Sequence, residues 1–231
     1  MNDSTETEPR DAYSYYNRGL MKYGRGDFLG SIADNIKAIE LDPNARNAYY
    51  ANGYTRHYKV KDFGGAISDY SYAIELAHID TDVQSEAEAY YERGNVRYIL
   101  EDFIGAIFDY TKVIELAPYD SNLYLSRAHA KKKILDFPGA IADFTKVTEL
   151  YPKDEEAYKY MGLIKMELHD YDGAIIEFTR IIKIDSTNGR AYYYRGICKM
   201  KLIQNVSARL DFVKAKEFGY EADEEAKKYN Q

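Results

Sequence analysis

The chain has 231 residues and a formal net charge of −7, with 31 Lys and Arg against 38 Asp and Glu. A negative field disfavours non-specific binding to nucleic acid and acidic lipid, and no apolar run approaches the roughly 20 residues of a membrane-spanning helix. The single cysteine, Cys198, cannot form an internal disulfide, and no Cys/His cluster has the spacing of a zinc site. We therefore expect no nucleic-acid partner, no membrane insertion and no bound metal or cofactor.

Residues 1–10 differ in composition from the rest of the chain. They are polar and acidic, and they lack the apolar core of a secretion signal. This composition predicts a disordered acidic leader, because it offers few side chains to a packed core. The lone cysteine favours a cytoplasmic protein, although a signal peptide removed before residue 1 is also compatible with the sequence.

After the leader, the chain consists of six related segments, which we call repeats 1 to 6. The phrase Tyr90-Tyr91-Glu92-Arg93-Gly94 returns in variant form at residues 15–19 and 192–196. Its last, small residue recurs in steps of 34, 41, 34, 34 and 34 residues, at Gly19, Gly53, Gly94, Ala128, Gly162 and Gly196. A second small residue follows in the same order, at Ser31, Ala66, Ala106, Ala140, Ala174 and Ala208. Two registers that agree over six segments indicate a true internal repeat.

Each repeat is expected to contain two helices. In the second half of repeat 3, the apolar residues 106, 107, 110, 113 and 114 fall on one face of a helix. An aspartate precedes an aromatic residue at the start of this half in the first five repeats, at Asp27, Asp62, Asp102, Asp136 and Asp170. We expect these aspartates to cap the second helices. Prolines at 43, 118 and 152 should end second helices, whereas Pro138 lies in a first turn, where proline is tolerated.

A 34-residue helix-turn-helix segment with two small positions, an aromatic residue after the turn and a closing proline resembles the tetratricopeptide repeat. The resemblance covers about residues 12–220. It implies an all-α fold, an α-solenoid in which antiparallel helix pairs form a right-handed superhelix. The implied repeat domain spans 11–220, with repeats at about 12–44, 45–80, 87–120, 121–154, 155–188 and 189–220. The charged, helix-prone residues 221–231 are expected to form a C-terminal capping helix.

The sequence departs from this pattern in four places. His78, Ser186 and Tyr220 stand where a proline is expected in repeats 2, 5 and 6. Repeat 2 has one extra residue before Asp62, which leaves the register of its first helix ambiguous. About six extra residues near 81–86 either extend a helix or form a loop before repeat 3. In repeat 6, Gln204-Asn205 replaces the aspartate and aromatic residue, as terminal repeats are often atypical.

Every repeat places a cation on its first helix and a carboxylate on its second. The cations precede the first small residue by one position (Arg18, Arg93, Arg127 and Arg195, with Asn52 and Met161 as exceptions) or follow it by three (Lys22, Arg56, Arg97, Lys131, Lys165 and Lys199). The carboxylates are Asp34, Asp69, Asp109, Asp143, Glu177 and Asp211. We interpret them as a charged ladder of ion pairs between packed helices, because opposite signs recur in fixed register. The alternative is a charged binding strip.

The family resemblance implies that the first helices line a concave groove. The positions that would face it include Tyr16, Tyr50, Tyr54, Tyr91, Asn95, Tyr98, His129, Arg190 and Tyr193. A tyrosine-rich groove would suit recognition, because tyrosine offers a large contact area with few rotamers to order. The alternative is that most of these rings pack against neighbouring helices.

The sequence contains no motif that predicts an enzyme. None of the four histidines has a metal-ligand spacing, and no phosphate-binding loop or nucleophile motif is present. The chain is therefore expected to be a non-catalytic scaffold that binds a protein or peptide, as an adaptor in a multiprotein complex. A structural protein that self-associates as a homo-oligomer is the alternative.

Overall fold

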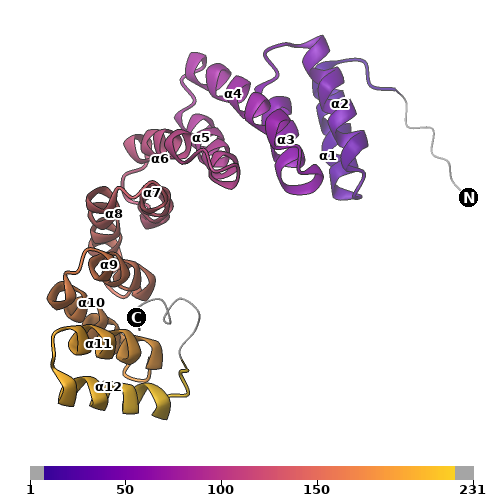
Figure 1. The fold of residues 1–231 in the computed structure, drawn as a ribbon. Coiled ribbons are helices and arrows are strands. Elements are labelled where there is room, and N and C mark those ends of the chain that lie inside the picture. Colours follow the sequence, from indigo (N-terminus) through magenta and orange to yellow (C-terminus); the bar gives the residue numbers. More distant parts are fainter. Residues whose placement is uncertain (1–7, 222–231) are drawn as a thin grey trace, which may run out of the picture. The chain divides into compact units, whose positions relative to one another are not determined.

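The computed structural model describes residues 8–221, and all regular secondary structure within that range is helical. The chain divides into two compact units, Met1–Tyr119 and Asp120–Gln231. The N-terminal unit contains α1 (Ala12–Gly24), α2 (Phe28–Leu41), α3 (Arg46–Thr55), the π-helix η1 (Arg56–Val60), α4 (Phe63–Ile79), α5 (Val83–Ile99) and α6 (Phe103–Leu116) (Figure 1). The C-terminal unit contains α7 (Ser121–Lys133), α8 (Phe137–Leu150), α9 (Glu155–Glu167), α10 (Tyr171–Ile184), α11 (Gly189–Lys201) and α12 (Asn205–Glu217). The expected capping helix and residues 1–7 of the expected leader lie outside the described residues.

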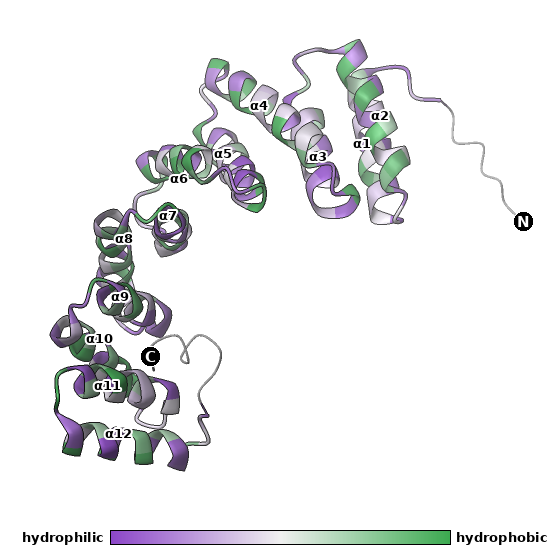
Figure 2. Cartoon of the chain, in the orientation of Figure 1, coloured by the Kyte–Doolittle hydropathy of each residue, from purple (hydrophilic) through white to green (hydrophobic). Residues whose placement is uncertain are grey.

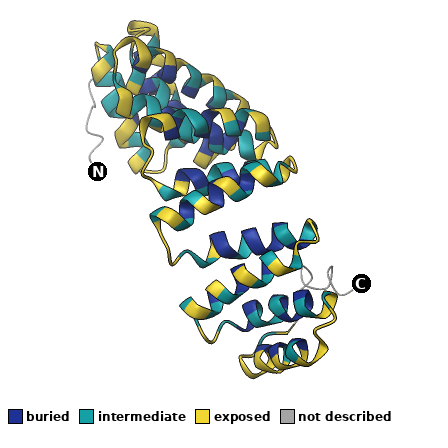
Figure 3. Cartoon of the chain, turned by 90° about the vertical axis from the view of Figure 1, so that its left-hand side faces the viewer, coloured by how far each residue is buried: buried dark blue, intermediate teal, exposed yellow. Residues whose placement is uncertain are grey.

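Within each unit, the main packing contacts join helices that are adjacent in the chain. Buried positions recur along the helices of both units, so no single central core dominates (Figure 3). This arrangement is an all-α solenoid, as the repeat pattern predicts. The small residues lie where paired helices cross: a Cβ atom added to Gly162 would lie 2.7 Å from the ring of Phe178.

The turns between paired helices are built by one recurring device. The Oδ1 atom of each predicted capping aspartate accepts a hydrogen bond from a glycine amide at 2.9–3.0 Å, and these caps are Asp27, Asp62, Asp102, Asp136 and Asp170. The residue before each cap has a positive φ angle. Glycine takes this conformation readily at Gly26, but Leu135 and Ile203 adopt it at φ 61° and 60°. At α12 the N-cap is Gln204, whose side chain makes no capping bond.

The extra residue of repeat 2 is absorbed by a π-turn. The backbone amide of Asp62 donates to the carbonyl of Arg56, six residues earlier, whereas Asp102 bonds the carbonyl of Arg97, five residues earlier. The wider turn η1 therefore contains one more residue without displacing the groups on either side of it. Arg56 consequently keeps its place in the charged ladder. This settles the register of the first helix of repeat 2, which the sequence left ambiguous.

The insertion near residues 81–86 lengthens helices and forms no long loop. Helices α4 and α5 have 17 residues each, against 14 in α2 and α6. Only a short turn separates Ile79 from Val83. Arg46 of α3 reaches this turn and pairs with Asp82 at 2.8 Å.

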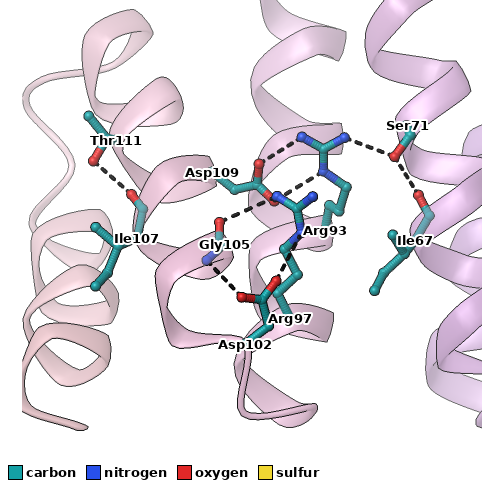
Figure 4. A network of polar contacts seen from close by, with 9 residues as sticks. All are labelled: Ile67, Ser71, Arg93, Arg97, Asp102, Gly105, Ile107, Asp109 and Thr111. Carbon is teal, nitrogen blue, oxygen red and sulfur yellow. Dashed lines mark hydrogen bonds and ion pairs between the residues drawn. The ribbon is translucent and has the colours of Figure 1, made fainter. Parts of the chain in front are cut away.

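The charged ladder is confirmed as a set of ion pairs between paired helices. In repeat 3, Arg93 contacts both oxygens of Asp109 at 3.0 and 2.7 Å, and Arg97 adds a bond at 2.8 Å (Figure 4). Asp109 has no exposed surface. Bidentate arginine contacts recur between Arg18 and Asp34, Arg127 and Asp143, and Arg195 and Asp211. Arg93 also donates to the Ser71 hydroxyl on α4 at 2.8 Å, which links repeat 3 to repeat 2.

The two repeats without this arginine depart from the pattern in different ways. In repeat 5, Met161 replaces the arginine, and Glu177 instead binds Lys165 at 2.6 Å and Arg180 at 2.9 Å. In repeat 2, Asn52 replaces it, and Asp69 has Arg56 as its ion-pair partner at 3.1 Å. Burial raises the pKa of Asp69 to about 7, because the nearby charge of Arg56 only partly offsets the loss of solvent. Repeat 2 therefore carries the weakest pair of the ladder.

Candidate partner-binding groove

The predicted groove residues of the N-terminal unit lie on α1, α3 and α5, and none of them is fully buried. Four of the five tyrosines, Tyr50, Tyr54, Tyr91 and Tyr98, nevertheless pack against a neighbouring ring: the ring centroids of Tyr50 and Tyr70 are 5.7 Å apart, and those of Tyr91 and Tyr110 are 6.1 Å apart. Burial raises the pKa values of Tyr16, Tyr50 and Tyr98. The rings are therefore held in place by packing and keep part of their surface open to solvent.

Three of these residues meet at a pocket between α1 and α3. Its volume is about 310 Å³, and Tyr16, Tyr50 and Tyr54 contribute to its wall. The remaining lining residues are Leu20, Tyr23, Ser31, Asn47, Ala51 and Thr55. A mainly apolar pocket of this size with a few polar groups is typical of a site for a small ligand or a side chain.

The other predicted residues of this unit lie along α5. Asn95 accepts a hydrogen bond from the hydroxyl of Tyr110 at 2.9 Å, so its carboxamide also positions a core ring. Tyr98 packs edge-on against Phe103, with 5.3 Å between ring centroids. Tyr91 and Tyr98 are separated by two turns of α5 and fall on the same side of the helix.

A polar cluster beside these residues is not evident from the repeat pattern. The hydroxyl of Tyr58 donates to Glu92 at 2.9 Å, and Nδ1 of the buried His57 lies 3.6 Å from the same carboxylate. Burial raises the pKa of Glu92, although hydrogen bonds from Tyr58 and Asn95 oppose the shift. Burial lowers the pKa of His57, so this imidazole favours its neutral form. The π-turn places Tyr58 beside Glu92. This contact could not be predicted from the sequence, because the extra residue of repeat 2 shifts Tyr58 by one position relative to the other repeats.

In the C-terminal unit, the predicted residues do not share a single site. Half-buried His129 packs edge-on against two rings that stack on each other, with its centroid 4.5 Å from Tyr160 and 5.4 Å from Phe144. Burial lowers the pKa of His129, although the charge of Glu156 opposes the shift. Arg190 lines a pocket of about 360 Å³ that also contains Glu155, Glu156 and Lys159.

Tyr193, also on α11, packs against Phe212 with 5.4 Å between ring centroids. It does not line the pocket that contains Arg190. Cys198 on the same helix is fully buried, and burial raises its thiol pKa to about 12, which makes it unreactive. None of the described helices is long and apolar enough to cross a membrane. Among residues 8–221 no group of three or more potential metal-binding side chains comes together.

Comparison with known proteins agrees with this architecture. A family model described as a tetratricopeptide repeat matches residues 87–120, the segment predicted as repeat 3. Six successive helix pairs share the small positions and the charged ladder of that segment, and five of them share its capping aspartate. Residues 87–120 are a tetratricopeptide repeat, and the chain has the α-solenoid fold of proteins built from such repeats.

Solved structures of other tetratricopeptide-repeat proteins share this fold. YrrB, described as having an unusual peptide-binding site, matches with a TM-score of 0.66 at 22% identity, over 76% of this chain and 87% of YrrB. MamA from Desulfovibrio magneticus matches with a TM-score of 0.64 at 17% identity, over 78% and 98% of the two chains. A protein of the same class from Parabacteroides merdae matches with a TM-score of 0.55 at 18% identity, over 98% and 87%.

No curated protein sequence matched this chain. The likeness to solved structures therefore concerns the fold alone. Tetratricopeptide-repeat proteins are generally non-catalytic scaffolds for protein interactions, because the fold provides surface and leaves the ligand to the side chains on it.

Proposed function

We propose that this protein is a non-catalytic scaffold that binds a protein or peptide through its first helices, as an adaptor in a multiprotein complex. The first helices of the N-terminal unit carry five of the predicted tyrosines, and each keeps part of its surface exposed. Partly exposed aromatic residues held by packing make effective binding contacts, because little side-chain entropy is lost on binding.

The observation that carries this proposal is that charged and aromatic side chains of the first helices have different roles. The ladder cations of the first helices are engaged by carboxylates of the second, so their charges are largely matched inside the protein. On the first helices of the N-terminal unit, Tyr50, Tyr54, Tyr91 and Tyr98 are held by contacts with neighbouring rings. A surface of half-buried rings therefore remains available for binding, beside paired helices whose ladder charges are matched within the protein.

The proposal is tested with a double variant, Tyr91→Ala/Tyr98→Ala, on α5. Affinity capture and mass spectrometry first identify a partner, and calorimetry with the purified partner then measures its affinity. We expect the double variant to weaken binding by about tenfold or more, because two aromatic contacts are lost. Tyr119→Ala is the matched control, since this ring is 86% exposed and lies beyond the end of α6. Unchanged affinity in the double variant would remove the groove from the proposal.

Self-association is the competing function, and one feature of α12 favours it. Val206, Leu210 and Val213 are exposed and spaced so that they share one face of the helix. Apolar and polar bands alternate along α12 in Figure 2. Light scattering over a range of protein concentrations separates the two functions: a monomer that binds a partner supports the scaffold, whereas a stable oligomer that Leu210→Glu disperses supports self-association.

A further inference from the structure

The negative charge of this chain belongs to its N-terminal unit. Residues 1–119 carry 12 Lys and Arg against 20 Asp and Glu, whereas residues 120–231 carry 19 against 18. The net charge of the C-terminal unit therefore does not repel an acidic partner, and the placing of its cations decides where such a partner binds.

The first helices of the C-terminal unit carry cations outside the charged ladder. The ladder lysines of this unit pair with carboxylates of the second helices at 2.6–2.8 Å. Three further cations, Lys132, Lys159 and Arg190, lie outside the ladder register and come from α7, α9 and α11 in turn. Each first helix of this unit thus contributes one of them.

Two of these cations meet at one ring. The ammonium groups of Lys132 and Lys159 lie 4.7 and 4.2 Å from the centroid of Tyr160. Because both distances end at the same centroid, the two ammonium groups lie within the roughly 10 Å over which charges interact in 0.1 M salt. The half-buried ring is held in place, since it stacks on Phe144 with 5.5 Å between centroids. Packing and attraction to the ring therefore hold two like charges close together.

The surroundings of these two lysines are positively charged. Among the charged groups that act on the half-buried His129 are Lys132, Lys133 and Lys159, against a single carboxylate, Glu156. Burial lowers the pKa of His129 and the lysines add to the shift, so its imidazole favours the neutral form. Lys159 forms no ion pair within residues 8–221. A carboxylate from outside the protein would therefore pair with Lys159 and reduce the repulsion between the lysines.

The positive surface continues from α9 to α11. Lys159 forms part of the wall of the pocket of about 360 Å³, and Arg190 lies in the same wall. Glu155, one of the two carboxylates in that wall, already accepts a hydrogen bond from Asn188 at 2.8 Å. Lys159 is thus shared between the ring of Tyr160 and this pocket.

We propose that the first helices of the C-terminal unit bind an acidic segment of the partner, whose Asp or Glu side chains pair with Lys132, Lys159 and Arg190. The proposal rests on the proposed function, and it adds the chemistry of the partner. In an extended chain, side chains two residues apart lie about 7 Å from each other on one face. Carboxylates at alternate positions therefore suit cations that lie no more than about 10 Å apart.

The test uses acetyl-Gly-Glu-Ala-Glu-Ala-Glu-Gly-amide as the probe, with versions in which Gln or Lys replaces every Glu. Binding to the full chain is followed by the NMR signals of the Lys132, Lys159 and Arg190 backbone amides. We expect saturable shifts with the glutamate peptide, about fivefold or weaker binding of the glutamine peptide, and no response to the lysine peptide. Raising the salt concentration from about 50 to about 500 mM should weaken binding of the glutamate peptide. Equal affinity for the glutamate and glutamine peptides would overturn the proposal.

A terminal carboxylate is the other source of the same charge. The glutamine peptide with a free C-terminal carboxylate in place of the amide separates the two sources. We expect this peptide to bind as weakly as its amidated form. If it binds as tightly as the glutamate peptide, the surface recognises a chain end, and the proposed recognition of side chains is wrong.

Two variants change the surface in opposite directions. Lys132→Gln/Lys159→Gln should weaken binding of the glutamate peptide by about fivefold or more, because two charge-assisted contacts are lost. Glu156→Gln removes the opposing carboxylate and should strengthen binding by about twofold. The matched control is Lys153→Gln/Lys183→Gln, which removes the same charge from exposed positions of this unit outside its first helices. Equal losses of affinity in the two lysine double variants would show that overall charge alone attracts the peptide, which contradicts the proposal.

The two proposals fail separately. A captured partner whose affinity falls with Tyr91→Ala/Tyr98→Ala but not with Lys132→Gln/Lys159→Gln leaves the groove of the N-terminal unit as the binding surface and excludes the acidic segment. A glutamate peptide that binds wild-type protein and not Lys132→Gln/Lys159→Gln supports the acidic segment even where the α5 double variant has no effect.

Discussion

The charged ladder places six carboxylates between paired helices, and their environments differ in one respect that matters for stability. At Asp34, burial opposes ionisation, but hydrogen bonds from Arg18 and Lys22 bring its pKa below the ordinary value. Asp69 lacks the bidentate arginine, and its pKa lies at about 7. Asp69 is therefore a source of instability at neutral pH, whereas Asp34 is held ionised by its partners.

Isosteric substitution of two ladder carboxylates should change stability in opposite directions. At pH 8, Asp69→Asn removes an underpaired buried charge and should raise the free energy of unfolding by about 1–3 kcal/mol. Asp109→Asn removes the partner of Arg93 and Arg97 and should lower it by about 3–5 kcal/mol. Urea denaturation of both variants measures the two effects. Destabilisation by both substitutions would show that Asp69 is adequately paired.

The pKa of Asp69 also predicts a pH dependence with a definite sign. Between about pH 4 and 7 the unfolded chain loses the Asp69 proton while the folded chain keeps it, so this group lowers stability as pH rises. Asn52→Arg supplies the partner found in four other repeats. We expect it to lower the pKa of Asp69 and to raise stability by about 1–3 kcal/mol at pH 8, with little effect at pH 4. NMR titration of the Asp69 carboxyl and denaturation at both pH values provide the measurement, and an unshifted titration would contradict the pairing.

The ladder was predictable because cations and carboxylates recur at constant spacing in the sequence. The sequence also shows that Asn52 and Met161 replace the ladder arginine. It does not show how the facing carboxylates are then paired: Glu177 gains a second partner, Arg180, whereas Asp69 has only Arg56 as its ion-pair partner. Likewise, the repeat pattern places Asn35 beside a ladder carboxylate but does not show that its carboxamide lacks partners.

The element boundaries follow from capping and helix termination. Aspartate caps and prolines predicted the start of α2, α4, α6, α8 and α10 and the end of α2, α6 and α8, because each acts through a local backbone interaction. The π-turn η1 could not be predicted, since an inserted residue can equally bulge as a loop. Its outcome depends on the packing of Arg56 against Asp69, which is a tertiary contact.

The cap missing from α12 offers a direct test at this scale. Gln204 makes no side-chain bond to the helix, whereas Asp82 accepts a bond from the Ser85 amide at 3.1 Å in an otherwise similar setting. Gln204→Asp places a carboxylate at the same distance in sequence from Ser207. We expect stabilisation by about 1 kcal/mol, measured as a higher midpoint of thermal or urea unfolding.

The control for this prediction is Asp170→Ala, which removes an existing cap from α10. It should lower stability by a similar amount. A Gln204→Asp protein that unfolds at the wild-type midpoint would indicate that the end of repeat 6 is already open before global unfolding begins.

On the scale of the whole molecule, stability is organised along the chain. Within each unit the main contacts connect each helix to its neighbours in sequence, as expected for repeat proteins whose stability is a sum of nearest-neighbour terms. A local defect should therefore remain local. This expectation could be drawn from the six-fold repetition, whereas the arrangement of the groove residues could not, because it depends on side-chain packing.

We predict that Asp211→Asn in α12 accelerates amide hydrogen exchange mainly in α11 and α12. It removes the partner of Arg195 and Lys199, and these groups belong to the last helix pair. Exchange in α7 and α8, at the other end of the same unit, should stay within error of wild type. Mass spectrometry of exchanged peptides resolves the two regions. Uniform acceleration from α7 to α12 would mean that the C-terminal unit opens as a single cooperative body.

The π-turn of repeat 2 has a consequence for how such a chain can change over time. The one extra residue of repeat 2 is accommodated inside a helix without disturbing the cap that follows it or the ion pair that precedes it. The number of residues in a repeat is thus less constrained than the order of its chemical groups. An extra residue in the π-turn changes which side chain of this turn faces solvent, while the helix pair keeps its cap and its ion pair. The turn is therefore a place where the binding surface can vary without a change in the fold.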